Sequence, residues 1–131
     1  MEQYFVGADC FLMSSRVDPF PCVIHEAMAA SLPVIAFAGA GGAPEAIADG
    51  AGFVLPYADY GQVAATIRLM RDQPEVIIGI RDRALQRVRQ KYQFHDYAEK
   101  VIDVCELVSG TEIRRGAVPS QTFELRLHRA A

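Results

Sequence analysis

Short apolar runs alternate with helical stretches in the first part of the chain, and this alternation limits the possible folds most strongly. Apolar runs at residues 10–15, 33–38 and 52–55 predict three strands, the first of them buried on both faces. Between them, residues 21–31 and 44–48 have the proline starts and apolar spacing of helices. A strand–helix–strand–helix–strand order implies right-handed crossovers. We therefore predict an α/β fold with about three parallel strands and flanking helices.

The remainder of the chain is predicted to be helical as far as Ser109. Apolar residues recur at helical spacing in three stretches, residues 59–73, 74–92 and 96–109, and Asp59 is placed to cap the first of them. After Gly110 this periodicity ends. We therefore divide the chain into one domain over residues 1–110 and a tail or linker over residues 111–131.

Composition excludes several classes of protein. The 131 residues carry 13 Lys and Arg against 16 Asp and Glu, so the net charge is −3 and argues against a nucleic-acid-binding protein. No apolar run is long enough for a transmembrane helix. The first residues contain no basic segment typical of a secretion signal, so we expect a cytoplasmic protein.

The first candidate site lies where the first predicted strand ends. Asp18 stands just before the helix at residues 21–31, and Glu26 lies inside that helix. Carboxylates accept hydrogen bonds only, so two of them near a helix start can each hold a pair of sugar hydroxyls. The free amides of the first helical turn suit a phosphate. Alternatively, Asp18 caps the helix and Glu26 is a solvated surface residue.

A second candidate segment follows the next strand. Gly41 and Gly42 would allow the backbone to approach a ligand closely, although they also suit an ordinary loop. The segment does not match a dinucleotide-binding G-x-G-x-x-G motif, and no Gly-Lys-Ser/Thr of a P-loop follows. A nicotinamide-dependent dehydrogenase is therefore disfavoured. His25 lies on the same helix as Glu26, within reach of a ligand, although the position of an ordinary polar helix residue explains it better.

Together these segments closely resemble the carboxyl-terminal, donor-binding half of retaining GT-B glycosyltransferases of the group 1 (family 4) type. The resemblance spans roughly residues 4–109 and rests on three motifs, Asp18-Pro19-Phe20-Pro21, Glu26-Ala27-Met28-Ala29 and Gly41-Gly42-Ala43-Pro44-Glu45. It implies a partial Rossmann-like domain with a C-terminal helical segment. The family carries two acids with seven residues between them, as Asp18 and Glu26 have here.

The resemblance also implies a role for each motif. Glu26 would hold the ribose hydroxyls of a nucleoside-diphosphate sugar, and Asp18 would face the donor sugar as the catalytic acid. The backbone of Phe20, Pro21 and Cys22 would lie near the donor, with the amides of Phe20 and Cys22 available to it. The loop with Gly41, Gly42 and Glu45 would flank the donor. The resemblance implies transfer of a hexosyl-type unit to an acceptor hydroxyl with retention. It implies no metal and no cofactor.

Two departures from the family pattern are visible. Asp18 is one methylene shorter than the Glu that is usual there. The chain also starts near the middle of the nucleotide-binding domain, without the acceptor domain or the Arg/Lys pair for the diphosphate, and Arg16 is the only cation near the motif. We therefore expect a fragment that is inactive alone and that self-associates through the exposed sheet edge.

Two alternatives remain open from the sequence. In the first, the chain is a non-catalytic module that binds a sugar nucleotide or mediates an interaction, and it works with a separate partner chain. In the second, the chain is a structural remnant of a shortened reading frame. The donor nucleotide, the sugar and the acceptor are not identified by the sequence.

Overall fold

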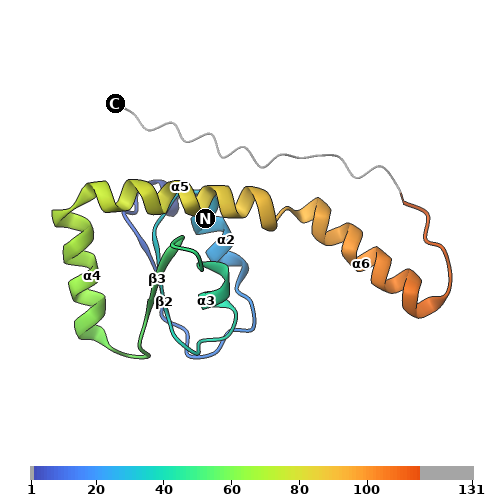
Figure 1. The fold of residues 1–131 in the computed structure, drawn as a ribbon, viewed down its shortest axis with the longest axis horizontal. Coiled ribbons are helices and arrows are strands. Elements are labelled where there is room, and N and C mark those ends of the chain that lie inside the picture. Colours follow the sequence, from blue (N-terminus) through green and yellow to red (C-terminus); the bar gives the residue numbers. More distant parts are fainter. Residues whose placement is uncertain (1, 116–131) are drawn as a thin grey trace.

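The computed structural model describes residues 2–115, which form a three-stranded parallel sheet with helices on both faces (Figure 1). The strand order is β1-β2-β3, and Ile35 of the central strand is in register with Leu12 on one side and Phe53 on the other. The predicted α/β class and strand–helix alternation are confirmed. In chain order the elements are α1 (Glu2–Val6), β1 (Phe11–Met13), α2 (Cys22–Ala29), β2 (Val34–Phe37), α3 (Ala43–Ala46), β3 (Gly52–Leu55), α4 (Tyr60–Asp72), α5 (Pro74–Lys91) and α6 (Phe94–Ser109).

The central strand β2 separates two apolar clusters. All four of its residues are buried, as expected for a parallel strand with both faces covered. Val34 and Ala36 point to the face covered by α2, α3 and α5, where Ile24 and Met28 are fully buried. The residues of the other face belong to a second cluster with α4 and β3, which comprises Ile35, Phe37, Ala40, Leu55, Val63 and Met70.

The long helix α5 lies along the amino-terminal ends of the strands. In Figure 1 it crosses the top of the sheet, and the loops that follow β1, β2 and β3 gather at the bottom. Arg83 of α5 donates a hydrogen bond to the carbonyl of Gly50, just before β3, at 2.8 Å. The carboxyl-terminal ends of the strands therefore lie on the side away from α5.

Strand β1 differs from its prediction in length and in burial. It spans three residues instead of six, and Leu12 is 40% exposed, so burial on both faces is wrong. The physical reason is its place in the sheet: β1 is an edge strand that pairs with β2 alone. The short helix α1 was not predicted, and its buried Phe5 packs edge-on against Phe11 at 6.1 Å between ring centroids.

Helix α6 extends away from the sheet (Figure 1), and it carries a stripe of exposed apolar side chains. It begins at Phe94, two residues before the predicted start, and none of its residues is buried. Six large apolar side chains on α6 are exposed, namely Phe94, Tyr97, Val101, Val104, Leu107 and Val108. Their spacing is amphipathic, and this surface has no packing partner within residues 2–115.

The end of the described chain folds back onto α6. Gly110 ends the helix in the left-handed conformation, and Arg115 then pairs with Asp103 at 2.7 Å and with Glu106 at 3.1 Å. These contacts hold residues 111–115 beside α6, whereas the rest of the predicted tail lies outside the described residues. No helix in the described range is both long and apolar enough to cross a membrane.

The loop after β2 generates a prediction about Gly41. Gly41 has φ of 86°, and an added Cβ would overlap the carbonyl oxygen of Asp18. Gly39 is the matched control, because its φ is 72° but a Cβ there would meet nothing within 4 Å. We expect Gly39→Ala to cost about 1–2 kcal/mol, the penalty of left-handed backbone alone, and Gly41→Ala to cost at least about 2 kcal/mol more.

Urea denaturation of both variants measures the difference. Equal losses of unfolding free energy in the two variants would show that the close approach to Asp18 is unimportant.

Candidate functional site

Two loops from the carboxyl-terminal ends of β1 and β2 are joined by backbone hydrogen bonds. Asp18 and Gly41 form an isolated parallel bridge, in which the Asp18 amide donates to the Ala40 carbonyl at 3.2 Å. The Gly42 amide donates to the carbonyls of Asp18 at 3.2 Å and Pro19 at 2.9 Å. The structure therefore brings the two motif segments that the sequence singled out into direct contact.

The two glycines of this segment are required by that contact. At Gly42 an added Cβ would overlap the Phe20 ring and lie 2.5 Å from the Pro19 carbonyl oxygen. At Gly41 the obstacle is the Asp18 backbone. Close approach of a ligand to these glycines stays a prediction, but packing of one loop on the other already requires small residues here.

Asp18 and Glu26 occupy the start and the solvent side of α2. Helix α2 is held by its buried residues Ile24, Ala27 and Met28, so Glu26 faces outward and is exposed. Asp18 is half-buried in the loop before the helix.

The start of α2 has no side-chain cap. Its N-cap residue is Pro21, and no side chain accepts a hydrogen bond from the first turn. The alternative that Asp18 caps this helix is therefore wrong. Asp59 shows the contrast at α4, where its carboxylate accepts from the Gln62 amide at 2.9 Å, as predicted. The first amides of α2 are thus left available to an external acceptor.

An aromatic cluster fixes the loop against α2 and the end of α5. His25 lies 5.0 Å from the Phe20 ring and 4.3 Å from the Tyr92 ring, centroid to centroid. Burial lowers the pKa of His25, and its Nε2 finds no hydrogen-bond partner among the described residues. His25 is therefore a neutral packing residue at pH 7, which differs from the ordinary polar position predicted for it. Tyr92 was missed, because no local pattern links it to the motif.

Glu45 lies in the first turn of α3, directly after the glycines. Its side chain is exposed, and its carbonyl oxygen accepts a hydrogen bond from Arg87 of α5 at 2.8 Å. Helix α3 also packs against α2. The glycine segment and Glu45 are thus placed by two neighbours, α2 and α5.

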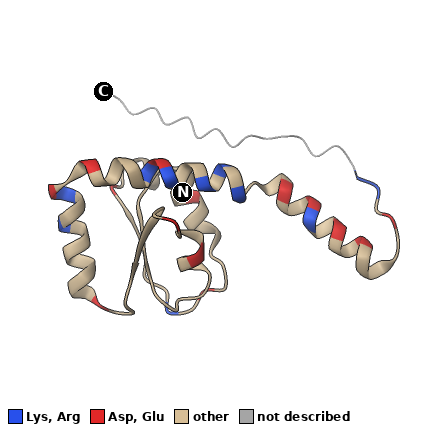
Figure 2. Cartoon of the chain, in the orientation of Figure 1, with Lys and Arg blue, Asp and Glu red and all other residues tan. Residues whose placement is uncertain are grey.

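Positive charge is scarce at this edge of the sheet. Among the loops that follow the three strands, residues 14–21, 38–42 and 56–59, Arg16 is the only Lys or Arg. Its guanidinium lies over the ring of Tyr57, 5.8 Å from the centroid. Helix α5, at the opposite edge, carries five basic residues, Arg81, Arg83, Arg87, Arg89 and Lys91 (Figure 2).

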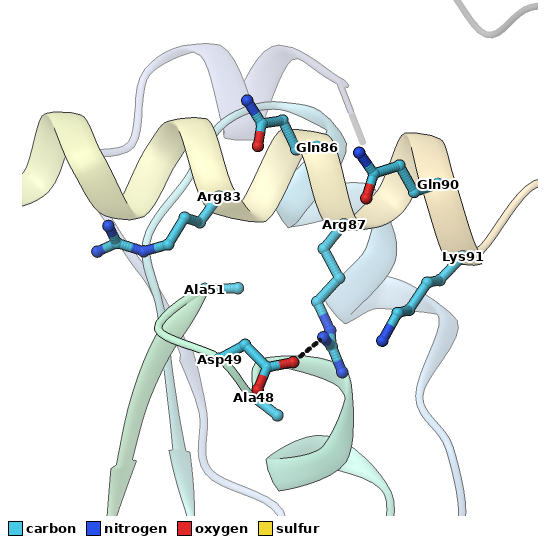
Figure 3. Close-up of a pocket in the computed structure, with 8 residues that line it drawn as sticks. All are labelled: Ala48, Asp49, Ala51, Arg83, Gln86, Arg87, Gln90 and Lys91. Atoms are coloured by element: carbon cyan, nitrogen blue, oxygen red, sulfur yellow. Dashed lines mark hydrogen bonds and ion pairs between the residues drawn. The ribbon is translucent and has the colours of Figure 1, made fainter.

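A cavity of about 250 Å³ lies at that opposite edge, between α5 and the segment before β3 (Figure 3). Three of the charged side chains that line it, Asp49, Arg83 and Arg87, make contacts within the protein. Arg83 donates to the Gly50 carbonyl, and Arg87 pairs with Asp49 at 2.7 Å. The cavity is therefore distinct from the motif loops. It is lined by Ala48, Asp49, Ala51, Arg83, Gln86, Arg87, Gln90 and Lys91.

Comparisons with known proteins identify the family. The model of the family described as glycosyl transferases group 1 matches residues 1–92. A sucrose synthase from Acidithiobacillus caldus is 32% identical over 114 residues, which cover 81% of this chain and 14% of that protein. The chain thus spans about one seventh of this curated relative.

Two solved structures have the same fold. A sucrose-phosphate synthase from Thermosynechococcus elongatus superposes with a TM-score of 0.74 at 24% identity, over 82% of this chain and 27% of that one. The C-terminal domain of a group 1 glycosyl transferase from Francisella tularensis gives a TM-score of 0.62 at 26% identity, over 70% and 47%. The matched region contains β1 to β3 and both motif loops, and the chain belongs to the group 1 glycosyltransferases.

Proposed function

We propose that the edge formed by Asp18, Glu26 and the Gly41–Gly42 segment binds a nucleoside-diphosphate sugar. The observation that carries the proposal is the Asp18–Gly41 bridge, because it assembles two separate motifs beside the uncapped start of α2. In open parallel sheets, ligands bind beyond the carboxyl-terminal ends of the strands, where these loops lie.

Each residue has a proposed task that its position allows. Glu26 is exposed on α2 and accepts hydrogen bonds from the ribose hydroxyls. Asp18, near the bridge, faces the donor sugar. The amides of the Phe20–Cys22 segment face the diphosphate, since the start of a helix favours negative charge. Glu45 and the glycines form the wall on the α3 side.

The proposed reaction is transfer of a hexosyl-type unit with retained anomeric configuration. The bond between the anomeric carbon and the donor phosphate oxygen breaks, and a bond to the acceptor oxygen forms. The acceptor loses its hydroxyl proton, and the nucleoside diphosphate leaves with the electron pair of the broken bond. Negative charge therefore grows on the diphosphate during transfer, and nearby cations would stabilise it.

The 131-residue chain by itself is predicted to have no transferase activity. The loops at the site provide Arg16 alone as a cation, against Asp18, Asp59 and other nearby acids, so the leaving diphosphate is poorly stabilised. Product formation is measured by mass spectrometry with the uridine and adenosine diphosphate forms of glucose. Turnover by the purified chain that is abolished in Glu26→Ala would contradict the prediction.

Addition of a separate protein that restores turnover would favour the alternative of a binding module with a partner chain.

A cytoplasmic location stays a prediction of the sequence.

Binding of the nucleotide alone tests the role of Glu26. We expect uridine or adenosine diphosphate to bind with at best millimolar affinity. Loss of one charge-assisted hydrogen bond in Glu26→Ala would weaken binding by about 1.5–3 kcal/mol, roughly 10-fold or more. Glu75→Ala, at an exposed acid of α5, is the control for net charge. Equal affinity of the two variants in NMR titration would remove Glu26 from the site.

The exposed edge strand supports a second proposal, self-association through β1. In a parallel strand alternate residues point their amide and carbonyl groups to opposite sides. The Phe11 amide bonds to the Pro33 carbonyl at 2.9 Å, so the backbone groups of Leu12 face away from β2. No Lys or Pro interrupts this edge, and such an edge can pair with another chain.

Leu12→Lys is expected to reduce this association, because the Leu12 side chain is 40% exposed and its replacement places a charge at the edge. Val54→Lys is the matched control on the other edge strand, where Val54 is 44% exposed. Light scattering at tens of micromolar gives the mass of each variant. A monomeric parent chain, or loss of association only in a variant of the α6 stripe such as Val104→Lys, would exclude pairing through β1.

A further inference from the structure

Arg87 connects α5 to the end of α3, and its side chain is only 11% exposed. Its Nε donates to the Ala46 carbonyl at 2.8 Å, and its Nη2 donates to the Glu45 carbonyl at 2.8 Å. Its Nη1 pairs with the Asp49 carboxylate at 2.7 Å. Figure 3 shows the guanidinium pointing from α5 to the chain between α3 and β3.

Helix α3 needs such a contact because it is only four residues long. A single helical turn is unfavourable in isolation, since it orders several residues for very few hydrogen bonds. Two such bonds are present here, from the Ala46 amide to the Gly42 carbonyl at 3.0 Å and from the Ile47 amide to the Ala43 carbonyl at 3.3 Å. Without Arg87, the Glu45 carbonyl would accept only from the Ala48 amide at 3.3 Å, and the Ala46 carbonyl would lack a partner among the described residues. A cation there also interacts favourably with the helix dipole.

The opposite end of α3 is the donor-site segment. Gly42, its N-cap, bonds to the carbonyls of Asp18 and Pro19. Helix α3 is thus attached at one end to the motif loop and at the other end to Arg87. At 1.5 Å per residue the helix is about 6 Å long, so movement at one end is transmitted to the other.

We propose that Arg87 is a positioning residue that holds α3, and with it Gly42 and Glu45, in place for the donor site. The link to the donor rests on the proposed function above. The arrangement needs arginine, because three donors of one planar guanidinium serve three separate acceptors. A lysine ammonium keeps the charge but lacks this fixed fork.

Arg83 provides a matched control. It lies one helical turn earlier on the same side of α5, and it donates a single hydrogen bond to a backbone carbonyl, that of Gly50. It therefore shares the charge, the helix and the edge of the sheet with Arg87 but makes no hydrogen bond to α3. Variants at the two positions separate a general effect of α5 from the specific contact with α3.

Amide hydrogen exchange measured by NMR tests the positioning role without any ligand. In Arg87→Met we expect the Ala46 and Ile47 amides to exchange at least tenfold faster, with the amides of β2 unchanged. Arg83→Met should leave Ala46 and Ile47 as in the parent chain. Arg87→Lys should fall between Arg87→Met and the parent, because one ammonium nitrogen keeps the charge but replaces the three guanidinium nitrogens that reach three separate acceptors. Uniform acceleration of all amides, or none at Ala46 and Ile47, would overturn the proposal.

Two further variants address folding and specificity. Asp49→Asn removes the negative charge that pairs with the Arg87 guanidinium and keeps the size of the side chain at position 49. It should accelerate exchange at the same two amides, and it replaces Arg87→Met as the test if that variant does not fold. In Arg87→Ala, added methylguanidinium chloride should slow exchange at the Ala46 and Ile47 amides, compared with the same concentration of sodium chloride. Absence of that rescue in folded Arg87→Ala would count against the guanidinium contact.

Titration with uridine and adenosine diphosphate gives the functional readout. We expect affinity to fall about tenfold in Arg87→Met and to stay unchanged in Arg83→Met. Local acceleration of Ala46 and Ile47 without any change in affinity would overturn the link between Arg87 and the donor site. If the parent chain binds neither nucleotide, the proposed function fails, and the exchange pattern still decides whether Arg87 holds α3.

Discussion

The backbone bridge between Asp18 and Gly41 is the interaction on which the candidate site depends. It joins the loop after β1 to the loop after β2, and it requires two consecutive glycines because any Cβ would meet backbone or the Phe20 ring. The aromatic cluster of Phe20, His25 and Tyr92 then packs the same loop against α2 and the end of α5. The bridge therefore determines where Asp18 lies relative to α3.

The charge distribution divides the molecule into two unlike edges. The carboxyl-terminal edge carries the motif acids and one arginine, whereas the amino-terminal edge carries the basic residues of α5 (Figure 2). Two of those basic residues, Arg83 and Arg87, bind backbone carbonyls of α3 and of the segment between α3 and β3. Helix α5 is thus a structural support, and the proposed donor edge depends on helix amides and Arg16 for its positive potential.

Residues that act together at this site are distant in sequence. Arg87 contacts α3, and Tyr92 contacts the loop before α2, so the carboxyl-terminal end of α5 supports both motif segments. Helix α3 is too short to be stable alone, so the contact of Arg87 with its end also affects the Gly41–Gly42 segment at its start. Helix α6 has no such role among the described residues, and its apolar stripe remains exposed.

The sequence by itself determined the α/β class, the order of the elements from β1 to α6 and the residues of both motifs. These follow from hydrophobic periodicity, proline and glycine positions and acid spacing, which are local properties. The helix start at Asp59 was predicted for the same reason. The family resemblance rested on the same local motifs.

Only the tertiary structure decided which residues support the site and which surfaces are exposed. Leu12 is exposed because β1 is an edge strand, and periodicity cannot say which strand lies at an edge. Gly41 and Gly42 suit a ligand loop or an ordinary loop equally in sequence, and it is the approach of Asp18 that gives them a task. In the sequence Arg87 resembles any solvated cation of a helix, and only the packing of α3 against α5 shows its contacts. Contacts of this kind join residues far apart in the chain, so no local pattern encodes them.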